Sequence, residues 1–113
     1  MAHDVSGIWN IKQSNGYTVQ VNIDQLRFDN VVIDGPLSGT AQEYTPHGTD
    51  ISNPNQTLQD GKLDGDAFVI RINWGNDTLG HYSGFFDPFG RLSGVTYDEM
   101  HPGAQATWFR QDV

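Results

Sequence analysis

Two segments of the chain alternate apolar and polar residues with the two-residue period of a half-buried β-strand. In residues 17–24 the apolar side chains occupy the odd positions, and Thr18, Gln20 and Asn22 form the polar face. In residues 67–74 the apolar side chains occupy the even positions and end at Trp74. A polar face of this kind is not needed inside a tightly packed barrel, so it is one argument for a bound ligand.

The remaining strands have weaker alternation but are bounded by turn residues. We expect them at residues 8–13, 26–33, 37–44, 56–63, 80–87, 91–98 and 105–111. Residues 45–55 carry Pro46, Gly48 and Pro54, which predicts an exposed loop that could act as a lid. Residues 99–103 are expected to form a loop or a single helical turn.

About eight short strands with short connections and no convincing helix indicate an all-β protein. Sequential antiparallel strands in this number close most economically into a small up-and-down barrel, because closure removes exposed sheet edges. A two-sheet β-sandwich is the alternative. At 113 residues, the chain is expected to form one domain over 1–113.

A five-residue phrase that begins and ends with glycine occurs four times in the chain, and this repetition supports the barrel. The copies begin at Gly35, Gly61, Gly80 and Gly90, and each reads Gly, any residue, a large apolar residue, Ser or Asp, Gly. The first glycine suits a turn with a positive φ, and the second allows a bulge or a close neighbour in the strand that follows. Strands built in this way curl and close.

Composition limits the function classes. The formal net charge of −8 disfavours nucleic acid and anionic membrane surfaces as partners. The absence of cysteine excludes a disulfide framework and a thiolate metal site. The first residues lack the basic and apolar regions of a signal peptide, which fits a cytoplasmic protein or a secreted one whose leader has been removed.

Several motifs resemble the avidin and streptavidin family of small β-barrels. The chain opens with residues 5–10, Val-Ser-Gly-Ile-Trp-Asn, and continues with residues 35–40, Gly-Pro-Leu-Ser-Gly-Thr. These resemble the Gly-x-Trp-x-Asn and Gly-x-Leu-x-Gly-Thr strands of that family, and Tyr82-Ser83-Gly84 resembles its aromatic-Ser-Gly strand. The resemblance implies a barrel and, as one functional alternative, a biotin-type ligand. It implies ligand contacts at Trp9, Asn10, Trp74 and Trp108.

Three predicted strand ends combine an aromatic residue with Asp or Asn. They are Trp74 with Asn76 and Asp77, Phe86 with Asp87, and Tyr97 with Asp98. Sugars require this mixture, since an aromatic face stacks on the C–H face of the ring while amide and carboxylate groups take its hydroxyls. Asx residues are also ordinary turn formers.

Motifs for nucleophilic, nucleotide-dependent or zinc-dependent catalysis are missing, so no catalytic residue, cofactor or metal site is expected. Asp98, Glu99 and His101 lack regular ligand spacing. The sequence therefore predicts a non-catalytic, lectin-like barrel that binds a carbohydrate or another small neutral ligand, with homo-oligomerisation as an option. The alternatives are avidin-like binding of one small molecule and a protein-interaction or inhibitor module.

Overall fold

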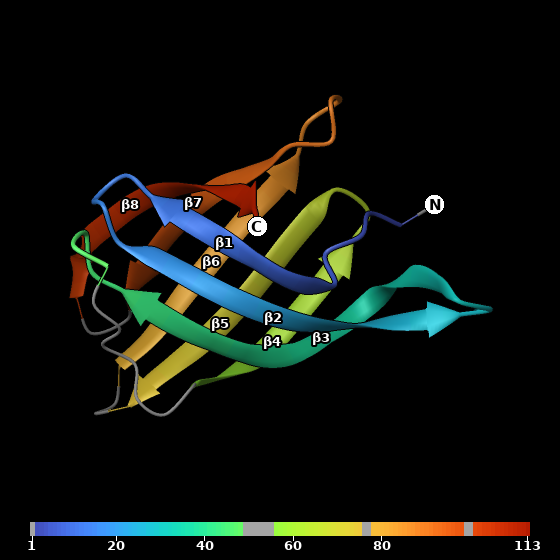
Figure 1. Ribbon diagram of the computed structural model, residues 1–113, viewed down its shortest axis with the longest axis horizontal. Helices are drawn as coiled ribbons and strands as arrows, with labels where there is room; N and C mark the ends of the chain where they lie inside the picture. The colour runs from blue at the N-terminus through green and yellow to red at the C-terminus, as the bar shows by residue number, and fades with distance from the viewer. Residues whose placement is uncertain (1, 49–55, 76–77, 99–100) are drawn as a thin grey trace.

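The computed structural model describes residues 2–48, 56–75, 78–98 and 101–113, and this part of the chain forms eight antiparallel strands in one closed barrel. Each strand pairs with its neighbours in sequence, and β1 pairs with β8 to close the sheet (Figure 1). The strands are β1 (Gly7–Gln13), β2 (Thr18–Phe28), β3 (Val31–Tyr44), β4 (Gln56–Asp64), β5 (Ala67–Gly75), β6 (Thr78–Phe86), β7 (Leu92–Asp98) and β8 (His101–Asp112). The prediction of an up-and-down barrel is confirmed, and the sandwich is excluded.

The described residues include no helix long and apolar enough to cross a membrane.

The barrel interior is filled by side chains from alternating positions of every strand. On β2, Val19 and Val21 are fully buried, so the polar face of the same strand points outward. The interpretation of Thr18, Gln20 and Asn22 as a polar lining is therefore wrong. Strand alternation fixes which face is apolar, but only closure of the sheet decides that this face is the inner one.

Three aromatic rings occupy the centre of the core. The Phe68 ring lies between Trp9 and Trp108, with ring centroids 5.7 Å and 5.9 Å away. All three side chains are at most 2% exposed. This contact closes the middle of the barrel to any ligand.

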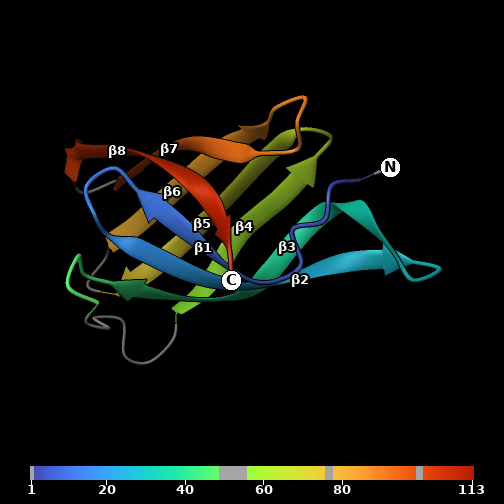
Figure 2. The ribbon, with the colours of Figure 1, turned by 45° about the horizontal axis from the view of Figure 1, so that its top comes forward.

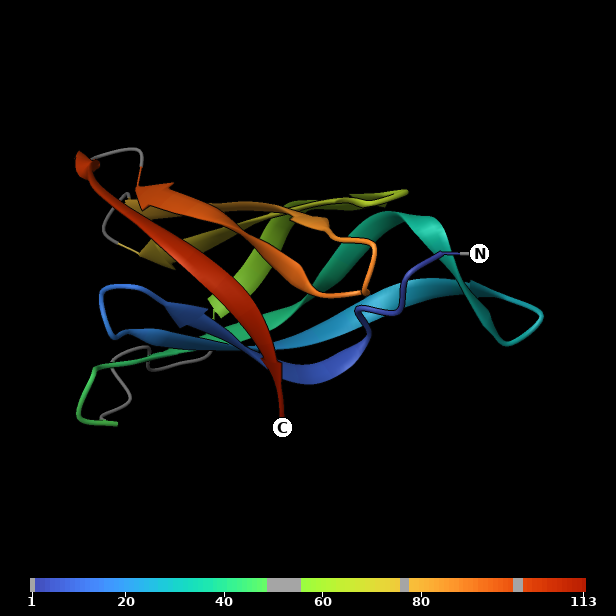
Figure 3. The same ribbon diagram turned by 90° about the horizontal axis from the view of Figure 1, so that it is seen from above.

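We expected residues 26–33 to form a separate strand, and this prediction is wrong. The segment contains the end of β2, a turn at Asp29 and Asn30, and the start of β3. Both turn residues have positive φ, 51° and 65°, which is the geometry of the tightest β-hairpins. The sequence signal was therefore the Asp-Asn pair, and the two long strands form a hairpin that extends beyond the barrel (Figure 3).

The glycine phrases are partly explained by close approach of neighbouring strands. A Cβ on Gly94 would lie within 1.8 Å of the Ser83 carbonyl oxygen, so no side chain fits there. Gly90, which opens the same phrase, has φ of 80° in the β6–β7 turn. The first glycines of the other phrases lie inside strands and not in turns, so that part of the prediction is wrong.

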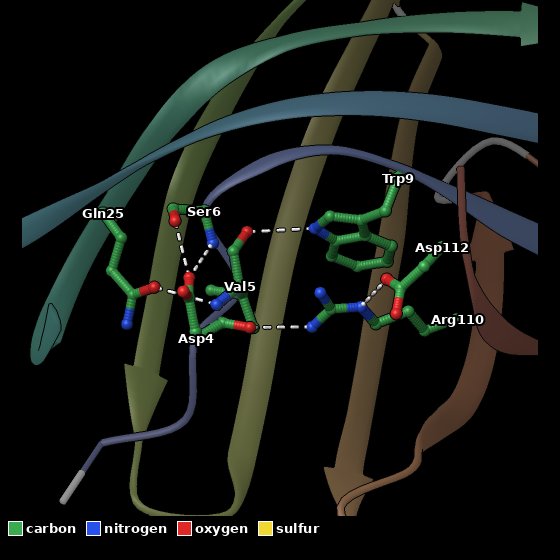
Figure 4. Close-up of polar contacts among 7 residues, drawn as sticks. All are labelled: Asp4, Val5, Ser6, Trp9, Gln25, Arg110 and Asp112. Carbon is green, nitrogen blue, oxygen red and sulfur yellow. Dashed lines mark hydrogen bonds and ion pairs between the residues drawn. The ribbon is translucent and has the colours of Figure 1, made fainter.

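The two ends of the barrel are closed differently. At one end the N-terminal segment places Val5, which is fully buried, in the core (Figure 4). The Val5 N–H donates to Oε1 of Gln25 at 2.8 Å, and the Val5 carbonyl accepts from Nε1 of Trp9 at 2.9 Å. Arg110 donates to the Asp4 carbonyl at 2.8 Å. At the opposite end β1, β3, β5 and β7 finish (Figure 2), and we call this end the mouth.

Candidate functional site

Polar side chains from four strands point inward at the mouth. On β3, Glu43 follows the buried Ala41 by two positions, and on β5, Trp74 follows the buried Ile72 by two. Strand alternation therefore turns both side chains toward the barrel axis. The set is completed by β6 and β7, and its members are Glu43, Trp74, Tyr82, Thr96 and Asp98.

The strand register brings these residues together. Tyr82 pairs with Thr96 across β6 and β7, and both are nearly buried, at 3% and 5% exposure. Asp98 is opposite Gly80, two residues nearer the mouth than this pair. A Cβ on Gly80 would lie 2.8 Å from Nε1 of Trp74, so the glycine makes the room into which the indole packs.

The buried Tyr82 hydroxyl is held by side-chain hydrogen bonds with Trp74 and Thr96. The indole N–H is a donor only, so the phenol oxygen accepts from it. Burial raises the pKa of Tyr82 far above its usual value, and the negative charges of Glu43 and Asp98 act in the same direction. The phenol is therefore neutral and fixes the edge of the indole.

The two carboxyl groups of the mouth interact. Burial raises the pKa of Glu43, and the nearby charge of Asp98 raises it further. Both side chains are half-buried. A carboxylate accepts hydrogen bonds and cannot donate them, so this part of the mouth favours a ligand that supplies hydroxyl or N–H donors.

Two of the residues predicted from strand ends meet at this mouth, Trp74 and Asp98. Asn76 and Asp77 lie outside the described residues. Tyr97 is on the outer face of β7, where its ring stacks on His81 with centroids 4.6 Å apart and planes 5° apart. The structure therefore brings together one aromatic residue and one carboxylate from two different predicted clusters.

The third predicted cluster lies at the other end of the barrel. Phe86 is the last residue of β6, and Asp87 begins the β6–β7 turn. The Asp87 carboxylate accepts hydrogen bonds from the backbone N–H groups of Phe89 and Arg91, both at 2.9 Å, and from Nε of Arg91 at 3.0 Å. These bonds lower its pKa, the Arg91 backbone bond most of all. This carboxylate shapes the turn.

The three residues implied by the family resemblance near the start and end of the chain lie away from the mouth cluster. Trp9 and Trp108 are 1% and 2% exposed, and their N–H groups donate to the backbone carbonyls of Val5 and Val95. Asn10 lies between the inward residues Trp9 and Ile11 of β1, so its half-buried side chain points out of the barrel. The two indoles thus belong to the core that lies beneath the mouth.

Sequence reasoning missed Glu43, Tyr82 and Thr96. Each lies at an inward position two or four residues from an apolar core residue, so parity within its strand was the available signal. Glu43 lies in a predicted strand that lacks clear alternation, so the sequence did not show whether its side chain points inward or outward. The structure shows a register shift in this strand between Leu37 and Thr40. A shift of this kind hides which face a later residue occupies.

Among the residues that the structure describes, no group of three or more His, Asp or Glu side chains could hold a metal ion. No family model, curated protein or solved structure matches the chain. The avidin-like ligand contacts therefore stay a prediction, and the function has to be argued from the mouth itself.

Proposed function

We propose that this protein is a non-catalytic binder that takes a small, neutral, hydroxyl-rich ligand, such as one sugar unit, into the mouth of the barrel. The observation that carries the proposal is the convergence of an indole, a phenol and two carboxyl groups at one end of the barrel, from four strands. Small ligands bind in concave sites with an apolar wall and a few placed polar groups, and the mouths of β-barrels are common locations for them.

The roles of the residues follow from their chemistry. The Trp74 ring offers a flat apolar surface, and its orientation is fixed through the hydrogen bond to Tyr82. Glu43 and Asp98 accept hydrogen bonds from ligand donors, and hydrogen bonds to charged groups contribute about 1.5–3 kcal/mol each. The packed rings of Trp9, Phe68 and Trp108 form the floor, which limits the ligand to the outer part of the barrel.

A cyclic amide or urea, as in the avidin-like alternative, would satisfy the same groups with N–H donors. The cluster lies inside the barrel, and not at the exposed strand ends expected from the sequence. This position suits the binding of one small molecule, as in the avidin-like alternative. The two ligand classes share the donor requirement, so the experiment has to contain both.

The test is to measure the binding of a panel of monosaccharides and of biotin by isothermal titration calorimetry. Asp98→Asn keeps the shape of the side chain and removes its charge, and we expect it to weaken binding of the ligand that is found by about 10- to 100-fold, as the loss of one charged hydrogen bond implies. Asp64→Asn is the matched control, because Asp64 is exposed at the end of β4, away from the mouth.

Sugar binding that Asp98→Asn weakens and Asp64→Asn leaves unchanged would support the proposal. Stoichiometric binding of biotin without sugar binding would replace the sugar by the amide class. Equal affinity of both variants and the unmodified protein would remove the mouth as the site.

A further inference from the structure

The outer surface of the second half of the barrel carries an uncovered apolar face. Phe85 is 67% exposed, Val95 41% and Phe109 54%. The register places Phe85 and Phe109 on either side of Ser93 in one row across β6, β7 and β8. We use the term apolar face for the outward residues Val69, Ser83, Phe85, Ser93, Val95, Thr107 and Phe109.

None of the residues of the apolar face is charged, although the chain has fourteen acidic and six basic residues. Charged residues border it on both sides. Lys62 and Asp64 of β4 pair with Val69 and Ala67, and Lys12 of β1 pairs with Phe109. Two copies of a chain with a net charge of −8 repel each other over most of their surface. The apolar face is the surface on which a second copy meets the least repulsion.

Two grooves lie on the apolar face. A groove of about 280 Å³ lies over β4, β5 and β6 beside Phe85. A second groove of about 500 Å³ lies over β7, β8 and β1 beside Phe109. Each exposed phenylalanine thus borders a groove, and Ser93 lies midway between the two rings.

The size of the apolar face is sufficient for a weak dimer. Four strands about 4.8 Å apart and two rows of outward residues about 7 Å apart give a footprint of roughly 270 Å² in projection. Side chains that stand on this footprint expose more area than the projection. Two copies would bury less than the roughly 1,200 Å² at which stable interfaces begin, an area typical of weak and transient complexes.

We propose that the apolar face pairs with the same face of a second copy, about a two-fold axis that runs along β7 between them. A two-fold contact is self-complementary, so a residue that contacts another receives the same contact in return. Phe85 of each copy enters the groove beside Phe109 of the other, and the two Ser93 residues face each other across the axis. This inference does not depend on the ligand of the mouth.

The hairpin of β2 and β3 carries the other large exposed apolar group, which includes Phe28 at 70% exposure. It is a two-stranded ribbon and extends away from the barrel (Figure 3), so it offers a narrower footprint than four strands do. It provides the matched control for the apolar face, because a phenylalanine of similar exposure can be changed there.

The first test is sedimentation velocity of the full chain over a wide range of concentrations. We expect the mass to rise from the 12.6 kDa of one copy toward twice that value. Phe85→Asp places a charge in the contact, and we expect it to weaken dimerisation at least about tenfold, since a buried unpaired charge is costly. Phe28→Asp should leave the dissociation constant unchanged.

The second test uses the absence of cysteine from the chain. Ser93→Cys introduces a single thiol on the proposed axis, and mild oxidation should convert it into a disulfide-linked dimer at concentrations where the dimer forms. Ser38→Cys, on the exposed outer face of β3, should cross-link far more slowly. This test does not require a charge in the contact, so it remains valid if Phe85→Asp fails to fold.

A protein that stays at the mass of one copy up to about 1 mM, far above the micromolar dissociation constants of weak specific complexes, would overturn the proposal. So would a dimer that Phe28→Asp dissociates and Phe85→Asp does not, or equal cross-linking rates at Ser93→Cys and Ser38→Cys.

Discussion

The closed end of the barrel gives the sharpest test of what stabilises this fold, and Gln25 is the residue to change. Its side chain is 8% exposed. Oε1 accepts the Val5 N–H at 2.8 Å, while Nε2 donates to the carbonyls of His3 at 2.8 Å and Ile33 at 3.3 Å. One side chain therefore joins the N-terminal segment to both strands of the β2–β3 hairpin.

Gln25→Leu keeps the approximate volume and removes all three bonds. The buried Val5 N–H loses its partner, which costs about 1–3 kcal/mol, and the two Nε2 bonds contribute about 0.5–1.5 kcal/mol each. The greater hydrophobicity of leucine offsets part of this loss. We expect the free energy of unfolding to fall by about 2–4 kcal/mol, which at roughly 3–5 °C per kcal/mol lowers the Tm by about 10 °C.

The measurement is urea unfolding followed by tryptophan fluorescence, because the Trp9 indole is bonded to the same Val5. Gln20→Leu is the matched control, since it makes the same substitution on the outward face of the same strand. A surface change of this kind should alter stability by less than about 0.5 kcal/mol. If Gln25→Leu is as stable as Gln20→Leu, the N-terminal segment does not stabilise the barrel through Gln25.

Gly94→Ala should cost more than about 3 kcal/mol or prevent folding, because its Cβ would overlap the Ser83 backbone oxygen, whereas Ser93→Ala should be nearly neutral in the same thermal melts; a Gly94→Ala protein with an unchanged Tm would contradict the close strand contact. Glu43→Gln addresses the pH dependence of stability. Burial raises the pKa of Glu43 in the folded state, so the fold favours the protonated form, and this contribution is present below the unfolded-state pKa and is lost as the pH rises through the folded-state pKa. The stability of Glu43→Gln relative to the unmodified protein should therefore increase from acidic to neutral pH in urea unfolding, and a difference that does not change with pH would contradict this reasoning.

Much of the fold could be predicted from the sequence because the strands and turns of a small barrel have local sequence signals. Alternation in residues 17–24 and 67–74 identified β2 and β5, and turn residues identified most strand ends. The hairpin at Asp29 and Asn30 was missed because neither residue is glycine, although both adopt positive φ. Asn and Asp tolerate this conformation better than other residues, so the pair was a usable signal.

The site was harder to predict because a tryptophan has the same local pattern in a core as at a mouth. Trp9, Trp74 and Trp108 all occupy inward positions of strands, and only their height along the barrel separates them. That height depends on the stagger of neighbouring strands and on register shifts such as the one between Asn73 and Gly75. No sequence pattern fixes these quantities, so the three residues could not be distinguished in advance.

The proposed dimer has a geometric consequence for the proposed ligand site. An axis that runs along β7 keeps the direction of that strand, and β7 ends at the mouth beside Asp98. Both mouths would then open toward the same half of the dimer. Because barrel strands tilt about 35–45° from the barrel axis, the two mouths would diverge by roughly 70–90°.

Such a dimer could engage two sugar units of one branched or surface-bound glycan, which raises avidity without any new contact in either site. A dimer-disrupting change such as Phe85→Asp should therefore leave the affinity for a free monosaccharide unchanged and weaken binding to a dense glycan surface.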